Sequence, residues 1–130
     1  MAGITLDRFD HVVLTVQDVA ASSRFYETVL GMQKQVFEGS RVSLHFGQQK
    51  INLHPNPPTI ANVAKEARPG TADLCFIAQT PLTDVIAHLK ACEIEIIQGP
   101  EERVGALGTI NSVYFRDPDG NLIEVSNYLS

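Results

Sequence analysis

Four side chains with metal-binding chemistry stand in short apolar segments of the chain: His11, His54, Asp73 and Glu124. An imidazole or a carboxylate in an otherwise apolar strand is costly if it has no polar partner. A bound cation would satisfy it, and imidazole nitrogen together with carboxylate oxygen suits zinc, iron, nickel or manganese. If one coordination position stayed open, the metal would polarise a substrate oxygen or lower the pKa of a bound water.

These side chains can meet only if the strands that carry them turn the right faces toward a shared cavity. Side chains alternate between the two faces of a strand, so residues two apart point the same way. This alternation predicts four pairs or groups that share a face: His11 with Val13 and Thr15, Asn52 with His54, Asp73 with Cys75, and Glu124 with Ser126.

The first element that positions them is a strand followed by a helix. Residues 9–16 form a short, branched apolar run, which is typical of a buried strand. Asp18 then occupies an N-cap position, and apolar residues recur at helical spacing up to Leu30. Gly31 follows as a C-terminal stop. The pattern predicts an amphipathic helix directly after the first strand.

The same order recurs in the second half of the chain. Residues 72–78 are again a short apolar run, followed by Thr80 as a predicted cap and Pro81 at the predicted first helical position. A stripe of Leu82, Val85, Ile86 and Leu89 indicates the helix. We expect the next strand at 94–97, bounded by Gly99 and Pro100.

Each half then ends in a predicted hairpin, at 41–46 with 50–54 and at 110–115 with 121–126. His11 corresponds to Asp73 between the halves, and Asn52 corresponds to Glu124. Each half would be a strand, a helix and three further strands. The sequence therefore predicts an α+β fold of two βαβββ modules that form a curved mixed sheet around a cavity.

The length of 130 residues fits one domain. We expect residues 1–130 to form it, with module one at about 7–55, a linker at about 56–70 and module two at about 71–127. Residues 55–70 hold four of the seven prolines and have no strand pattern, although residues 61–67 could form a helical turn. The linker would let the modules pack within one chain or exchange with a second chain.

Composition excludes several classes of partner. The net charge of -5 and the scattered Lys and Arg residues argue against nucleic acid, which needs a basic face. No apolar run approaches the roughly 20 residues that cross a bilayer, and the N-terminal residues lack a signal pattern. We expect a cytoplasmic protein whose partner is a small-molecule substrate, with neither nucleic acid nor membrane.

Three motifs carry a family resemblance that covers nearly the whole chain. The opening Phe-Asp-His-Val-Val-Leu-Thr-Val, the helical Ser-Arg-Phe-Tyr-Glu-Thr-Val-Leu-Gly-Met and the closing Phe-Arg-Asp-Pro-Asp-Gly-Asn-Leu-Ile-Glu-Val resemble the vicinal oxygen chelate superfamily. That group includes glyoxalase I, extradiol dioxygenases, fosfomycin-resistance enzymes and bleomycin-binding proteins. The stretch Gln-Lys-Ile-Asn-Leu-His further resembles the short glyoxalase-domain-containing protein five type.

The resemblance implies that His11 and Glu124 are metal ligands, since both match the family in type and motif. Asn52 stands where glyoxalase I and its relatives usually have a carboxylate, and Asp73 stands where they usually have a second His. Asp73 is an oxygen ligand or a capping or ion-pairing residue. His54 either restores a set of two His and one carboxylate, or bonds locally or binds substrate.

The function implied by the resemblance is a divalent-metal-dependent lyase or isomerase of the glyoxalase, lactoylglutathione lyase-like, type. Glu124 would be the catalytic carboxylate that moves a proton, and the metal would be Zn, Ni, Fe or Mn. Two alternatives stay open: an iron-dependent extradiol dioxygenase, and a metal-free drug or metabolite binding protein of the bleomycin-resistance type. Many short members pair, so a homodimer with sites across the subunit boundary is expected.

Overall fold

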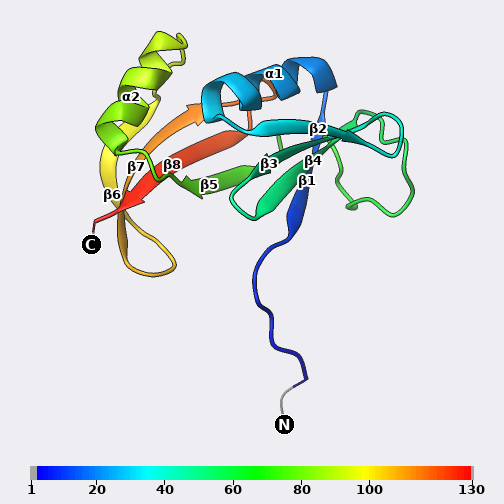
Figure 1. The fold of residues 1–130 in the computed structure, drawn as a ribbon, viewed down its shortest axis with the longest axis horizontal. Helices are drawn as coiled ribbons and strands as arrows, with labels where there is room; N and C mark the ends of the chain where they lie inside the picture. Colours follow the sequence, from blue (N-terminus) through cyan, green and yellow to red (C-terminus); the bar gives the residue numbers. More distant parts are fainter. Residues whose placement is uncertain (1–2, 130) are drawn as a thin grey trace.

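The computed structural model describes residues 3–129, which form two modules in succession along the chain (Figure 1). The first contains β1 (His11–Val16), α1 (Val19–Leu30), β2 (Gln33–Phe37), β3 (Arg41–Phe46) and β4 (Gln49–Pro55). The second contains β5 (Asp73–Ile77), α2 (Leu82–Ala91), β6 (Gln98–Val104), β7 (Thr109–Arg116) and β8 (Leu122–Tyr128).

Within residues 3–129 each module forms its own four-stranded mixed sheet, and the two sheets have equivalent strand orders, β1-β4-β3-β2 and β5-β8-β7-β6. In each sheet the first strand pairs in parallel with the last one, and the other neighbours are antiparallel. The predicted α+β class and the two βαβββ modules are confirmed. The hydrogen bonds divide the strands into two sheets, one for each half of the sequence.

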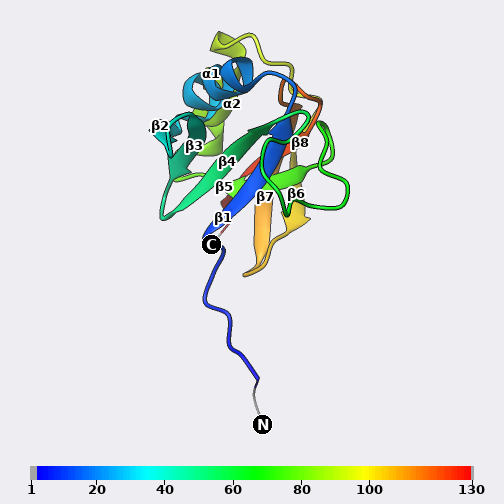
Figure 2. The same ribbon diagram turned by 90° about the vertical axis from the view of Figure 1, so that its right-hand side faces the viewer.

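Both sheets bury one face under a helix. The buried side chains alternate along the strands, as in Leu14 and Val16 of β1 or Ile123 and Val125 of β8. Helix α1 packs on β2, β3 and β4, whereas α2 packs on β7 and β8. Both helices lie on the same side of the sheets (Figure 2). The opposite face of each sheet, here called its open face, carries the polar side chains.

The prediction for α1 is confirmed at both ends. The Asp18 side chain accepts a hydrogen bond from the Ala21 backbone N–H at 3.0 Å, which satisfies one of the free donors of the first turn. Gly31 adopts the left-handed conformation with φ of 68° and ends the helix. Its neighbour Met32 donates to the carbonyl of Tyr26.

The predicted cap of α2 is wrong. The helix begins at Leu82, Pro81 occupies the N-cap position, and the N–H of Leu82 donates to Asn127 Oδ1 at 2.7 Å. Asn127 also donates to the carbonyls of Ala78 and Thr80. A side chain from the last strand therefore supplies the cap that we expected from Thr80, and a local sequence pattern contains no signal for such a distant partner.

The strand predicted at 94–97 is also wrong, because the strand that pairs with β7 is β6, at Gln98–Val104. Ile94 and Ile96 pack against the core without joining the ladder. The apolar pattern at 94–97 therefore indicates burial against the core and not a strand. The strand itself is mostly polar and exposed, and its register shifts between Gln98 and Glu101.

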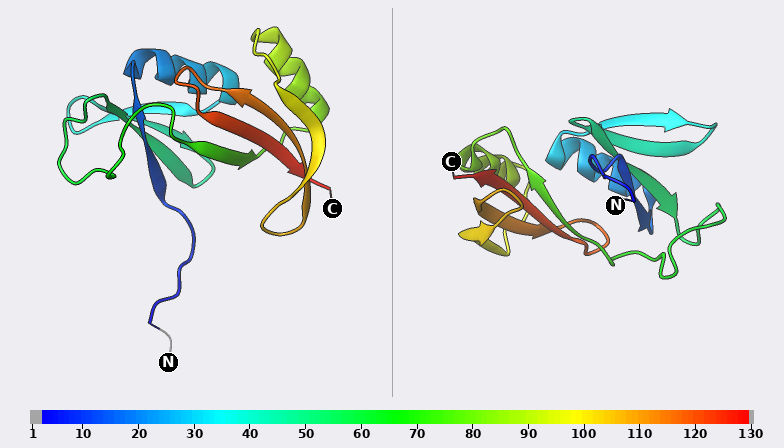
Figure 3. Two further views of the ribbon diagram at one scale, coloured as in Figure 1. Left: turned by 180° about the vertical axis from the view of Figure 1, so that it is seen from behind. Right: turned by 90° about the horizontal axis from the view of Figure 1, so that it is seen from below.

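The two modules share one core through contacts from α1 and the strand ends. Tyr26 donates to Asp117 Oδ2 at 2.6 Å, and its ring neighbour Phe25 lies 6.3 Å from the Phe115 ring. Phe46 of the first module meets Phe76 of the second, with ring centroids 5.3 Å apart. Figure 3 shows the modules side by side with β5 near the boundary. These contacts hold the open faces in a fixed relation.

Residues 56–72 connect the modules without a helix or a strand, and the possible helical turn at 61–67 is reduced to a turn at residues 65–66. Residues 3–10 extend away from both modules with exposed side chains (Figures 1 and 2). Neither helix within residues 3–129 has the length and apolar character that crossing a membrane would require.

Candidate functional site

His11 stands at the exposed start of β1, on the open face of the first sheet. The neighbouring Val12 packs against the core, so the alternation of the strand turns His11 to the opposite side. Its Nδ1 atom lies 2.8 Å from Asp10 Oδ2. This contact fixes the orientation of the ring and leaves Nε2 for a further partner.

Asp73 shares a depression with His11. The depression has a volume of about 250 Å³ and lies where β1, β4 and β5 approach one another, with Phe46 and Phe76 in its wall. Asp73 is the first residue of β5 and is exposed. The predicted correspondence of His11 and Asp73 thus places both at the start of the first strand of their sheets, beside a common depression.

Glu124 lies on the open face of the second sheet, in a network of polar side chains. Ser126 donates from Oγ to Glu124 Oε2 at 3.5 Å, and the same hydroxyl lies 2.6 Å from Ser112 Oγ. Tyr114 is the cross-strand partner of Glu124. Burial raises the pKa of Tyr114, and the hydrogen bond from Arg103 Nε, at 3.1 Å, opposes this shift. The carboxylate is held among hydroxyl groups.

A cavity of about 400 Å³ opens beside this network and is lined by Cys75, Arg103, Tyr114 and Glu124, among others. Arg103 is a site residue that the sequence pattern did not indicate. Arg103 lies on β6, where it forms an ion pair with Glu101. We had expected this strand at 94–97, so Arg103 fell outside it. Arg103 would have been found only by recognising that polar residues can form an edge strand.

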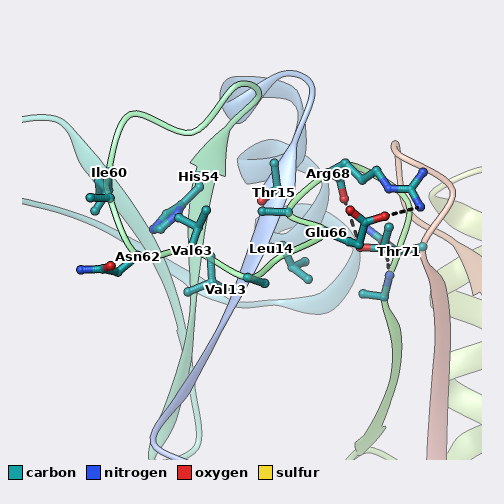
Figure 4. Close-up of a pocket in the computed structure, with 15 residues that line it drawn as sticks. Val13, Leu14, Thr15, His54, Ile60, Asn62, Val63, Glu66, Arg68 and Thr71 are labelled. Carbon is teal, nitrogen blue, oxygen red and sulfur yellow. Dashed lines mark hydrogen bonds and ion pairs between the residues drawn. The ribbon is translucent and has the colours of Figure 1, made fainter.

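His54 and Asn52 lie on the open face of the first sheet and are buried, with 7% and 5% of their surface exposed. Both ring nitrogens of His54 and the Oδ1 atom of Asn52 lack a hydrogen-bond partner among residues 3–129. Burial, followed by the charge of Arg41, lowers the pKa of His54. His54 lines a cavity of about 370 Å³ between the sheet and residues 60–72 (Figure 4).

One chain brings together His11 and Asp73 but not the whole predicted set. His54 and Glu124 each line a different cavity. The register pairs His11 of β1 with Lys50 of β4, and His54 lies four residues further along β4, so it is not level with His11. Within residues 3–129 no group of three or more His, Cys, Asp or Glu side chains is close enough to hold a metal. The metal site stays a prediction.

Two paired four-stranded βαβββ modules, with polar open faces that carry imidazole and carboxylate groups, define a small α+β protein of the vicinal-oxygen-chelate kind. The sequence profile of the Glyoxalase/Bleomycin resistance protein/Dioxygenase superfamily matches residues 8–125. The chain belongs to this superfamily. The resemblance inferred from the three sequence motifs is confirmed.

Two relatives match over nearly the whole chain. Virulence protein STM3117 of Salmonella typhimurium is 51% identical over 124 residues, which cover 95% of this chain and 86% of the relative. The crystal structure of STM3117 has a TM-score of 0.95 at 50% identity and covers 97% of this chain and 100% of that chain. Glyoxalase domain-containing protein RDO1 of Mycosarcoma maydis is 42% identical over 125 residues, 96% of this chain and 70% of the relative.

More distant structures share the fold alone. Lactoylglutathione lyase of Agrobacterium tumefaciens has a TM-score of 0.72 at 23% identity and covers 95% of both chains. TnmS3, an antibiotic binding protein from Streptomyces sp. CB03234, has a TM-score of 0.73 at 16% identity and covers 97% of this chain and 99% of its own. The fold therefore accommodates both a lyase and a binding protein.

Proposed function

We propose that this chain is a divalent-metal-dependent lyase or isomerase of the glyoxalase type that acts on a small oxygen-bearing substrate. The observation that carries the proposal is the 2.8 Å contact between Asp10 and His11 Nδ1. Metal-binding histidines commonly have a carboxylate on one ring nitrogen, which orients the ring and makes the other nitrogen a better ligand. His11 has this arrangement at the position that the family motif assigns to a metal ligand.

The remaining donor types fit a borderline divalent ion. Glu124 and Asp73 add carboxylate oxygens to the imidazole nitrogen of His11, a combination that suits zinc, nickel, iron or manganese. The distant fold relative FosX of Listeria monocytogenes, a fosfomycin resistance protein, has a TM-score of 0.65 at 17% identity, covers 95% of this chain and 92% of its own, and was crystallised with Mn(II). We give His54 no place in this metal site, because it lies four residues along the strand from the level of His11.

A second copy of the chain would complete the site. Strands β1 and β5 are each an edge of their sheet within residues 3–129, and an edge strand presents unpaired backbone groups to another chain. Both edges also expose apolar side chains, with Val13 45% and Ile77 51% exposed. A symmetric dimer that brings the first sheet of one copy to the second sheet of the other would unite His11 with Glu124 of the partner subunit.

A metal bound there would act as a Lewis acid toward a substrate oxygen. The chain's own residues would then handle the proton. On release from the metal, the Glu124 carboxylate would take up the proton that leaves the carbon beside the substrate carbonyl and return it to the neighbouring carbon. The Ser126 hydroxyl, 3.5 Å from Oε2, would orient the carboxylate. Tyr114 and Arg103 line the same cavity, so they can donate hydrogen bonds to an oxygen of the substrate.

Metal content tests this proposal. His11→Ala and Glu124→Ala should each lower bound divalent metal at least tenfold in protein purified without chelators, as measured by elemental analysis. His45→Ala is the matched control, because His45 lies on β3 of the same sheet and its Nε2 is 2.9 Å from Ser43 Oγ. Equal metal content in all four proteins would contradict the assignment.

The identity of the metal separates the lyase from the dioxygenase. Zinc or nickel in the purified protein favours isomerisation or lyase chemistry. Ferrous iron together with oxygen uptake on a catechol would favour the extradiol dioxygenase instead.

A metal-free binding protein is the second candidate function. Asn52 favours it, because an amide stands where the family's metal enzymes usually have a carboxylate, and the fold relative TnmS3 is an antibiotic binding protein. A small molecule that raises the melting temperature without being consumed, in protein that contains no metal, would support this candidate over the lyase.

A further inference from the structure

The most exposed large apolar side chains among residues 3–129 lie on two segments that project from the molecule. One segment is residues 3–10, here called the arm, and the other is residues 104–108, here called the hairpin tip. Large apolar groups that gather on projecting segments indicate an interaction surface. The four side chains, each 82–91% exposed, are Ile4, Leu6, Val104 and Leu107.

The arm continues β1 beyond the end of its own sheet. Asp10 is the last residue that the sheet holds, because its carbonyl accepts a hydrogen bond from the Lys50 N–H at 3.3 Å. In the described part of the chain, no backbone hydrogen bond joins residues 3–9 to either module. The arm leaves the sheets on the side opposite the helices (Figure 1). Its backbone and its apolar side chains are therefore free to pack on another surface.

The hairpin tip projects on the same side as the arm and is fixed by its own hydrogen bonds (Figures 1 and 2). The Gly105 N–H donates to the Gly108 carbonyl at 2.7 Å, and the Leu107 N–H donates to the Tyr128 hydroxyl at 3.1 Å. A Cβ at Gly105 would lie 3.0 Å from that hydroxyl, so the turn packs closely on β8. A turn that is already ordered loses little conformational entropy when another chain binds to it.

The hairpin tip also borders the cavity that contains Glu124. Val104, Gly105 and Ala106 line this cavity together with Ile77, an exposed apolar residue of β5. A segment that packs on the tip would therefore form an outer wall of the cavity beside Glu124.

The length of the arm matches the distance that it would have to span in the symmetric dimer proposed above. Leu6 precedes His11 by five residues, which span about 17 Å of extended chain. On the second sheet Glu124 pairs with Tyr114 of β7, and Val104 of β6 pairs with the residue five positions before Tyr114. With the proposed metal ligands of the two copies side by side, Leu6 extends as far along the second sheet of the partner subunit as Val104 does.

A second copy of the chain fits this surface better than an unrelated protein does. One chain carries both halves of the contact, so a two-fold axis pairs each arm with the tip of the other copy and covers all the exposed apolar groups together. Residues 3–6 and 104–108 contain no charged side chain, so their contact buries no unpaired charge. The arm does not cover the tip of its own chain, because both segments are exposed.

We propose that the arm of each copy packs on the hairpin tip of the other copy in a two-fold dimer, with Ile4 and Leu6 against Val104 and Leu107. The arm thereby forms the outer wall of the partner's Glu124 cavity and excludes water from it. The inference rests on the proposed function for the way in which the two sheets meet. It adds an interaction surface that lies outside the metal site.

Cross-linking tests the contact directly. The full chain with Leu6→Cys and Leu107→Cys, in which Cys75 and Cys92 are replaced by Ser, would be treated with a short bismaleimide and separated on a denaturing gel. The proposal predicts a covalent dimer. Leu6→Cys with Val36→Cys is the matched control and should stay monomeric, because Val36 is an exposed apolar residue of β2, the strand farthest from β1 in its sheet. A cross-link within one chain, or none at all, would overturn the proposal.

The strength of the dimer gives a second measurement, by sedimentation at a series of dilutions. Leu6→Asp and Leu107→Asp should each raise the dissociation constant of the dimer by about a hundredfold, because each substitution weakens both contacts of a two-fold dimer. Val36→Asp should leave the dissociation constant unchanged. A Leu6→Asp dimer that dissociates like the wild type would contradict the arm contact.

Metal content, measured where the dimer persists, separates this inference from the proposed function. A metal-containing dimer that is insensitive to Leu6→Asp and Leu107→Asp would overturn the arm contact alone. A dimer that depends on both residues but binds no divalent metal would support the arm contact and overturn the metal site. A wild-type protein that stays monomeric at every concentration would overturn both.

Discussion

The open faces of the two sheets have equivalent topology but treat their polar side chains differently. On the second sheet, Glu124, Ser126 and Ser112 are joined by hydrogen bonds, and Tyr114 is bonded to Arg103. On the first sheet, Asn52 and His54 stand at the corresponding places in β4 and keep buried atoms without a partner among residues 3–129. Two modules of the same topology thus carry one face that holds a carboxylate in position and one that leaves buried polar atoms without a protein partner among residues 3–129.

The difference extends to what covers each face. The first face is covered by the segment between the modules, whereas the cavity on the second is lined by the end of β6 and the start of the turn that follows it. A satisfied network keeps its geometry whether or not a ligand is present. Buried polar atoms without partners lower the stability of the first face.

The largest effect that we predict concerns the irregular strand of the second sheet. Gly99 has φ of 92°, and a Cβ there would collide with the backbone carbonyl of Ser112. Gly99→Ala should lower the free energy of unfolding by more than about 3 kcal/mol in urea denaturation.

Gly39 in the first module is the matched control. Its φ is 87° and a Cβ there would meet open space, so Gly39→Ala should lose about 1–2 kcal/mol. Equal losses for the two variants would mean that the close approach of β6 to β7 does not determine the irregularity of the second sheet.

The contact that joins the modules comes next. Tyr26→Phe removes the buried hydrogen bond to Asp117 and should lower the free energy of unfolding by about 1.5 kcal/mol. Tyr128→Phe, which removes a more exposed bond to the Leu107 N–H, should lose less than about 0.5 kcal/mol. An unchanged free energy of unfolding in Tyr26→Phe would show that apolar packing alone holds the modules together.

The sign of the effect should differ between the two open faces. Ser126→Ala breaks the satisfied network and should lower the free energy of unfolding by about 1 kcal/mol. Urea denaturation midpoints measure this change. A higher free energy of unfolding in Ser126→Ala would contradict the difference that we infer between the two open faces.

His54→Phe is the corresponding change on the first face, and we expect it to raise the free energy of unfolding by about 0.5 kcal/mol. The substitution replaces two unpaired buried nitrogens by carbon, in a cavity with room for the larger ring. The same denaturation experiment measures it in the absence of added ligand. A loss of 1 kcal/mol or more would indicate that His54 is satisfied in solution.

The sequence alone predicted those features that depend on neighbouring residues. The helix after β1 was predicted with both its caps, because Asp18 and Gly31 act within their own turn. The α+β modules followed from the repeated order of apolar segments. The superfamily followed from motifs that span most of the chain, and its profile match confirms them.

Features that depend on distant residues were not predicted. The cap of α2 comes from Asn127, and β6 is a polar edge strand whose place is set by β7, so neither leaves a local pattern. The cavity over His54 depends on the path of residues 60–72, which have no periodicity to indicate it. The sequence nominated His11, His54, Asp73 and Glu124 as metal ligands, and of these His11, Asp73 and Glu124 remain in the proposed site.

Complementation between variants tests the central claim most directly, because a site built from two chains can be restored by mixing. His11→Ala and Glu124→Ala proteins, each depleted of metal at the site, would be mixed, allowed to exchange subunits and analysed for metal after gel filtration. Random exchange of equal amounts makes about half of the dimers mixed, and in each mixed dimer one of the two sites regains both ligands. The account therefore predicts about a quarter of the wild-type metal content. Metal that stays at the level of the separate variants would contradict a site shared between two copies.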